Sequence, residues 1–158
     1  IPFRRINKLD DIKDKLEVCL VAGAGILPKE FVKKIVTINC HPGLIPSVRG
    51  LDAFKWAILD KKPLGITLHI IDKKIDSGKH LKSVKTSISK DDTIEQLAKK
   101  HYKLEIDLLA NFRKHLESPE KEMSNLARDK PRMRMPVNLE KSMLHGFEDY
   151  IKTFWNKE

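Results

Sequence analysis

Asn39 and His41 stand two residues apart at the end of a short apolar segment, and their side chains could do chemistry together. Side chains two positions apart on a β-strand point to the same side of the sheet. An amide can donate a hydrogen bond to a developing oxyanion, and an imidazole can take up and release a proton near neutral pH. The pair is therefore compatible with transfer chemistry at a carbonyl carbon, although a single histidine at a strand end is more often structural.

Short apolar runs at 18–22 and 35–39 are typical of strands that are covered on both faces, as in a parallel sheet. A turn and a short helix, with Pro28 near the first helical position, are predicted between these two strands. Prolines and glycines in 42–50 then predict a long loop directly after His41.

Downstream, the pattern predicts a helix over 51–60, a strand over 66–71, a strand near 80–86, a long helix to about 116, a polar arm over 117–137 and an amphipathic helix over 138–155. Alternating strands and helices predict an α/β sheet. Ligands bind beyond the carboxyl ends of the strands in such sheets, so the loops after Ala22 and Asn39 are the expected site.

The long helix is predicted from apolar residues spaced three or four apart. Asp91 or Asp92 is its predicted N-cap, and Asp92 with Glu95 has the spacing of a capping box. The residues of this apolar repeat are Ile94, Leu97, Ala98, Tyr102, Ile106, Leu109 and Phe112. His101 falls outside the repeat and is expected at the surface, together with His80, His115 and His145. Trp56, on the shorter helix before it, is expected in the core.

Composition limits the classes of function. The chain has 158 residues and a net charge of +9 that is spread along its length, which suits a solvated basic surface that attracts anionic small molecules. Only 6% of the residues are aromatic, which argues against RNA binding through exposed aromatic side chains. No apolar run approaches the roughly 20 residues of a membrane span, and no signal segment opens the chain. A cytoplasmic location is therefore expected.

The two cysteines, Cys19 and Cys40, lie in apolar segments and are expected to be reduced and buried. Neither belongs to a CxxC pair or a Cys/His cluster, so no metal site is expected.

A set of motifs follows Asn39 without a gap. It consists of Asn39-Cys40-His41-Pro42, Ile45-Pro46-Ser47-Val48-Arg49-Gly50, Trp56-Ala57-Ile58, Gly65-Ile66-Thr67-Leu68-His69 and Asp76-Ser77-Gly78. In order and spacing it resembles the 10-formyltetrahydrofolate-dependent formyltransferase family, above all its sugar N-formyltransferases and related bacterial enzymes. The resemblance covers about residues 17–116.

This resemblance implies transfer of a formyl group from 10-formyltetrahydrofolate, as co-substrate, to a primary amine without a metal. It implies three sets of residues: the catalytic residues Asn39, His41 and Asp76, the folate-binding residues Gly25, Ile26, Leu27 and Asp72, and the supporting residues Thr67, His69 and Arg49. In the family pattern, His41 binds the formyl oxygen and handles protons, and Asn39 stabilises the same oxygen. Asp76 orients His41 and, through water, helps to take the proton that leaves the amine.

The resemblance also implies a partial Rossmann-like, mostly parallel sheet with flanking helices, the formyltransferase fold, with its N-terminal βαβ portion missing. We expect residues 1–116 to be the C-terminal part of the catalytic domain, and residues 117–158 to be an arm and a C-terminal helix. A homodimer is left open, because the last helix could pack on the domain or on a second subunit.

The acceptor is expected to be a small-molecule amine, phosphorylated or nucleotide-linked. Arg49-Gly50 resembles the methionyl-tRNA and sugar N-formyltransferases more than the purine-pathway enzyme. The tail at 132–136, followed by an amphipathic helix, resembles the tails of bacterial sugar formyltransferases, so a nucleotide-linked amino sugar is favoured. Phosphoribosylglycinamide is the alternative. Methionyl-tRNA is a further alternative, although roughly 40 residues after the long helix cannot supply the C-terminal barrel of that enzyme. A non-catalytic folate-binding module is the alternative of another class.

Overall fold

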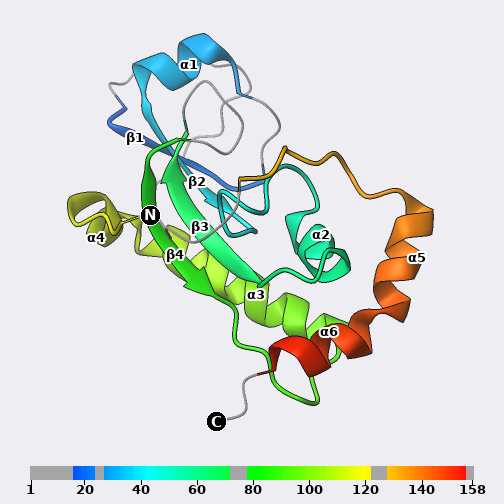
Figure 1. Cartoon of the computed structure of the whole chain (residues 1–158). Helices are drawn as coiled ribbons and strands as arrows, with labels where there is room; N and C mark the ends of the chain where they lie inside the picture. The colour runs from blue at the N-terminus through cyan, green and yellow to red at the C-terminus, as the bar shows by residue number, and fades with distance from the viewer. Residues whose placement is uncertain (1–15, 24–26, 72–77, 122–127, 156–158) are drawn as a thin grey trace.

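The computed structural model describes residues 16–23, 27–71, 78–121 and 128–155. The elements in chain order are β1 (Val18–Val21), α1 (Lys29–Lys34), β2 (Val36–His41), α2 (Ala53–Leu59), β3 (Gly65–Ile70), β4 (His80–Lys85), α3 (Ile94–Ala110), α4 (Phe112–Glu117), α5 (Val137–His145) and α6 (Phe147–Phe154). This order of strands and helices confirms the predicted α/β class (Figure 1).

The sheet has the strand order β1-β2-β3-β4 and is mixed. β1 and β2 pair in parallel, as predicted, whereas β2–β3 and β3–β4 are antiparallel. The expectation of a mostly parallel sheet is therefore wrong for the described strands. A parallel pair needs a crossover of about a dozen residues or more, and the connection over 71–79 is too short for one. The connection from β2 to β3 is longer, but its helix α2 packs against α5 and α6 rather than crossing the sheet.

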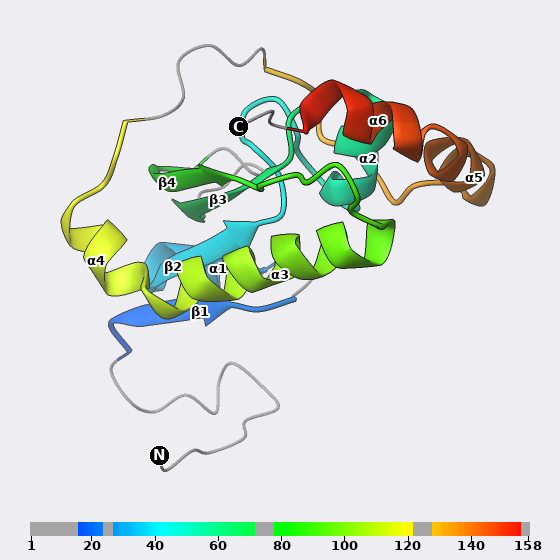
Figure 2. The same ribbon diagram turned by 90° about the horizontal axis from the view of Figure 1, so that it is seen from below.

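The two faces of the sheet differ in polarity. Ile38 and Cys40 on β2 and Ile66 and Leu68 on β3 face one side, where they form an apolar cluster with Leu108 of α3. Figure 2 shows α3 running along this face. The alternate residues of both strands are polar and face the opposite side, so the period-two pattern places the candidate residues together on that face.

A second apolar cluster joins α2 to the C-terminal helices and includes Trp56, Met143, Tyr150 and Ile151. Tyr150 is fully buried, and its hydroxyl donates to the Lys62 carbonyl at 2.8 Å. The single helix predicted over 138–155 is two helices that meet at Gly146. Their apolar side packs on this domain, and the prediction that Trp56 lies in the core is confirmed.

Helix α3 begins one residue later than predicted, because Thr93 and Gln96 form the capping box in place of Asp92 and Glu95. Its predicted apolar face is also partly wrong. Tyr102 and Ile106 are 63% and 47% exposed. The side of α3 that meets the molecule carries Leu97, His101 and Leu108 instead.

Strand β1 is the edge of the described sheet and is less covered than its apolar sequence predicts. Leu20 on β1 is 41% exposed, and Val36 at the start of the neighbouring β2 is 42% exposed. The expectation of full burial on both faces is therefore wrong here. Among the described helices, we find none with the length and apolarity that a membrane span requires.

Candidate active site

Asn39 and His41 are at the carboxyl end of β2, and their side chains share the polar face of the sheet. The antiparallel register pairs Asn39 with His69 and His41 with Thr67, so β3 supplies the other half of the group. The parallel pairing of β1 with β2 brings Val21 beside Asn39. The loop that follows β1 therefore starts at the same edge of the sheet, as the sequence predicts.

Asn39 contacts His69 across the two strands, with 3.2 Å between Asn39 Nδ2 and His69 Nε2. An amide nitrogen can only donate, so His69 Nε2 accepts the hydrogen bond. His69 is 2% exposed, which makes this contact a fixed part of the interior. The Asn39 amide carries a second N–H, which is the donor that an oxyanion would need.

His41 is 3% exposed, and its Nε2 lies 2.9 Å from the Val48 carbonyl oxygen. A carbonyl only accepts, so Nε2 carries a proton. In the neutral imidazole the lone pair then belongs to Nδ1, which is the nitrogen that can accept a proton. Gly43 permits this contact, because a Cβ there would lie 2.8 Å from the Val48 oxygen and 2.9 Å from His41 Nε2.

Thr67 holds the loop that begins at His41 through two hydrogen bonds. Its hydroxyl donates to the Gly43 carbonyl at 2.8 Å and accepts from the Ile45 N–H at 3.1 Å. Thr67 is fully buried, so both hydrogen bonds are sheltered from water. Thr67 therefore lies beside His41 and holds the backbone of the loop that follows it.

His101 was expected at the surface and is buried instead, with 4% of its surface exposed. Its Nε2 lies 3.2 Å from the Pro42 carbonyl, which only accepts, and its Nδ1 lies 2.7 Å from Thr86 Oγ1. Burial, with a smaller contribution from the nearby His41, lowers the pKa of His101 to about 4, and the hydrogen bond to Pro42 opposes this shift. His101 is therefore neutral at pH 7, and it holds the backbone of the residue that follows His41. The sequence did carry a signal for this burial. His101 follows the buried Leu97 by four residues, and residues four apart lie on the same side of a helix.

The buried His101 predicts a loss of stability in acid. The folded-state pKa of about 4 lies below the unfolded value of 6.5, so the unfolded chain binds the proton more tightly. The free energy of unfolding should fall as pH drops from 6.5 to 4, by about 3 kcal/mol for this group. In His101→Gln, the free energy of unfolding measured with urea should depend less steeply on pH across this range than it does in the wild type. The exposed His145→Gln is the control, and a slope that is equal in both variants would contradict the assignment.

Arg49 lies in the loop after His41, and 9% of its surface is exposed. Its Nη1 donates to the Asp129 carbonyl at 3.2 Å, so it joins the loop to the arm over 128–136. Leu27 is half-buried in the segment before α1. The other predicted residues, Gly25, Ile26, Asp72 and Asp76, lie outside the described residues.

The described part of the chain contains no group of three or more His, Cys, Asp or Glu side chains placed to hold a metal ion. Cys40 is buried on the apolar face of β2, and this burial raises the pKa of its thiol. Cys19 is half-buried rather than fully buried as expected, and both residues are unbridged thiols.

Comparison with known proteins gives a consistent picture. The family model described as "Formyl transferase" matches residues 6–112. The methionyl-tRNA formyltransferase of Thermodesulfovibrio yellowstonii is 36% identical over 98 residues, which is 60% of this chain and 32% of that protein. The chain thus spans about a third of the length of the curated relatives it matches.

Two solved structures extend the comparison. The formyltransferase PseJ from Anoxybacillus kamchatkensis, in complex with UDP-4,6-dideoxy-4-formamido-L-AltNAc and tetrahydrofolate, has a TM-score of 0.64 at 15% identity. The likeness covers 99% of this chain and 84% of the PseJ chain. The phosphoribosylglycinamide formyltransferase of Campylobacter jejuni has a TM-score of 0.57 at 27% identity, over 64% of this chain and 55% of its own.

Proposed function

This chain belongs to the formyl transferase family, and we propose that the protein transfers a formyl group from 10-formyltetrahydrofolate to a primary amine. The observation that carries the proposal is the placement of Asn39 and His41 on one polar face of the sheet, at the edge where the loop after β1 begins.

In the proposed reaction, the amine nitrogen attacks the formyl carbon and the bond from that carbon to the folate nitrogen breaks. Asn39 donates an N–H to the formyl oxygen while the tetrahedral intermediate carries negative charge. His41 takes up the proton that the amine loses, donates a hydrogen bond to the oxyanion, and passes the proton to the departing folate nitrogen. The resemblance adds Asp76 as the residue that orients His41, and Gly25, Ile26, Leu27 and Asp72 as contacts of the folate.

The acceptor that we propose is a nucleotide-linked amino sugar. The fold likeness to PseJ supports this, because it extends over 99% of the chain and therefore includes the arm and the C-terminal helices. Methionyl-tRNA is a second candidate, favoured by the 36% identity to the Thermodesulfovibrio enzyme. Phosphoribosylglycinamide is the third acceptor of the family, and the Campylobacter structure covers a smaller share of this chain.

The proposal is tested by incubating the full-length protein with 10-formyltetrahydrofolate and one amine at a time: a UDP-linked 4-amino sugar, methionyl-tRNA and phosphoribosylglycinamide. The readout is release of tetrahydrofolate, with the formylated product identified by mass spectrometry. We expect turnover with the amino sugar. Turnover with one of the other amines would reassign the acceptor, and folate binding without turnover on any amine would favour a non-catalytic folate-binding module.

A further inference from the structure

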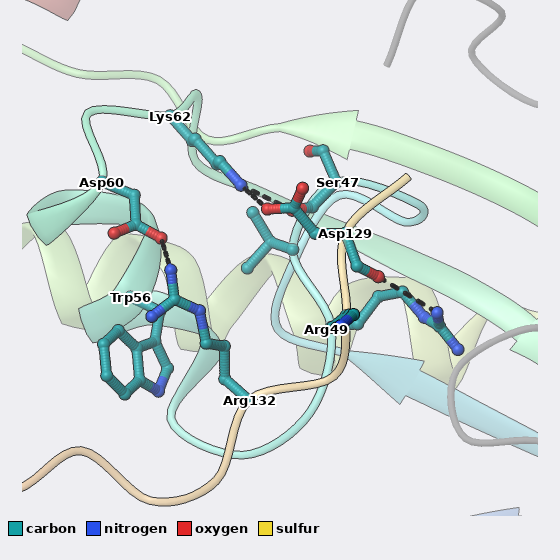
Figure 3. Close-up of a pocket in the computed structure, with 9 residues that line it drawn as sticks. Ser47, Arg49, Trp56, Asp60, Lys62, Asp129 and Arg132 are labelled. Carbon is teal, nitrogen blue, oxygen red and sulfur yellow. Dashed lines mark hydrogen bonds and ion pairs between the residues drawn. The ribbon is translucent and has the colours of Figure 1, made fainter. Parts of the chain in front are cut away.

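Residues 128–136 form an extended arm that lies beside the loop over 44–50 (Figure 3). The backbones of the two segments pair directly. The Arg132 N–H donates to the Arg49 carbonyl at 2.9 Å, and the Arg132 carbonyl accepts from the Leu51 N–H at 2.9 Å. These contacts join parts of the chain that are about 80 residues apart.

Lys62 and Asp129 make a second connection between the same segments. The Lys62 ammonium donates to the Ser47 carbonyl at 2.9 Å and forms an ion pair with the Asp129 carboxylate. The Asp129 N–H donates to the Pro46 carbonyl at 3.1 Å. Figure 3 shows Lys62 reaching both partners from one side of the loop.

Trp56 anchors the far end of the arm. Its indole N–H donates to the Met133 carbonyl at 2.8 Å, and the Arg132 guanidinium lies 4.4 Å from the centre of its ring. Arg132 also pairs with Asp60 at 2.7 Å. The Arg132 side chain is partly exposed, so this ion pair adds little, and the backbone hydrogen bonds are the main attachment.

Gly50 is the residue that lets the arm approach so closely. A Cβ at this position would lie 2.1 Å from the Arg132 carbonyl oxygen and 2.5 Å from the Arg132 nitrogen. Gly50 also has a φ of +91°, which favours glycine. Any larger residue there would displace the arm from the loop.

Together these contacts occupy four successive carbonyls of the loop. Pro46 accepts from the backbone of the arm, Ser47 from Lys62, Val48 from His41 and Arg49 from the backbone of the arm. The Val48 carbonyl, which accepts from His41 Nε2, therefore lies between two held carbonyls. Lys62 holds the Ser47 carbonyl on one side, and the arm holds the Arg49 carbonyl on the other. A shift of the loop would move the Val48 oxygen away from the imidazole.

We propose that the arm over 128–136, together with Lys62, is a positioning element that holds the Val48 carbonyl against His41 and so keeps the proton on Nε2. The His41 ring is thereby held in one orientation. This inference rests on the proposed function, in which His41 handles the proton. The arm itself touches no reacting atom, so its effect is on kcat through the state of the His41 ring.

The test compares Lys62→Met with Lys55→Met in the full-length protein. Both lysines pair with an acid near the C-terminal segments, but Lys55 pairs with Glu140 on α5 at 2.7 Å and does not hold the loop. Long-range ¹H–¹⁵N correlation spectra report which nitrogen of His41 carries the proton, with the His41 signals assigned from a His41→Ala sample. Steady-state kinetics give kcat and KM with the acceptor that the protein turns over.

In the wild type and Lys55→Met, Nε2 of His41 should carry a proton, as its contact with the Val48 carbonyl requires. In Lys62→Met the Nε2 signal should shift toward that of an unprotonated ring nitrogen, and kcat should fall by about 10-fold with KM nearly unchanged, as expected for weakened hydrogen bonds. Gly50→Ala, which displaces the arm without removing a charge, should produce the same change. In Lys62→Arg, which keeps the positive charge, both the His41 spectrum and kcat should lie close to those of the wild type.

A His41 spectrum unchanged in both Lys62→Met and Gly50→Ala overturns the inference. A fall in kcat without a change in the spectrum also overturns it, because the loss would then act by another route. A changed spectrum in a protein that formylates none of the three amines supports the positioning role and counts against the proposed function instead. The two proposals can therefore fail separately.

Discussion

Replacing His41 with alanine is expected to lower kcat on the order of 1000-fold, because a well-placed general acid–base group contributes about 100- to 10,000-fold. The side chain is buried and held by the Val48 carbonyl, so water cannot readily take its place in a defined geometry. The loss should appear in kcat rather than in KM for the folate, since His41 is proposed to act on the proton and on the oxyanion of the intermediate. The rate of tetrahydrofolate release at saturating substrate measures the fall in kcat.

His145→Ala is the matched control for His41→Ala, since His145 is exposed on α5 and its Nδ1 lies 2.8 Å from the Lys141 carbonyl of the same helix. Thermal unfolding of both variants separates a loss of chemistry from a loss of fold. A His41→Ala protein that keeps its fold and more than a tenth of the wild-type kcat would remove His41 from the proposed mechanism. Asn39→Ala should lose about 100- to 1000-fold, the range for one oxyanion donor.

Gly43→Ala is expected to lower kcat on the order of 100-fold, because displacing a catalytic group by about 1 Å can cost that much. The added methyl group would meet both atoms of the hydrogen bond between His41 and Val48, at 2.9 and 2.8 Å. Neither partner can yield easily, since one is backbone and the other a buried ring. Overpacking of this kind should also reduce the free energy of unfolding by about 1–3 kcal/mol.

Gly146→Ala is the control for this substitution. Its Cβ would meet nothing closer than 3.5 Å, so the change should leave kcat and stability nearly unchanged. Kinetics and urea unfolding are measured on both variants. A Gly43→Ala protein that is as active as Gly146→Ala would contradict the close packing of the loop on His41.

The sequence by itself determined the local features of this protein. The period-two alternation along β2 is enough to place Asn39 and His41 on the same side, and the structure confirms this through their pairing with His69 and Thr67. The helices and strands lie near their predicted positions because their apolar spacing is a local property of the chain. The motifs from Asn39 to Gly78 indicated the family that the comparison shows.

Only the tertiary structure decided the features that depend on contacts between distant residues. The antiparallel return of β3 was not readable from the sequence, since the connection over 42–64 is long enough for either strand direction and the packing of α2 on α5 and α6 decides between them. The burial of His101 depends on which side of α3 meets the molecule, and Thr86 and Pro42 supply its partners. The attachment of the arm to the loop after His41 joins residues about 80 apart, and no local pattern encodes such a pairing. Hydrogen bonds between distant segments follow from how the elements pack, and that packing places the Val48 carbonyl 2.9 Å from His41 Nε2.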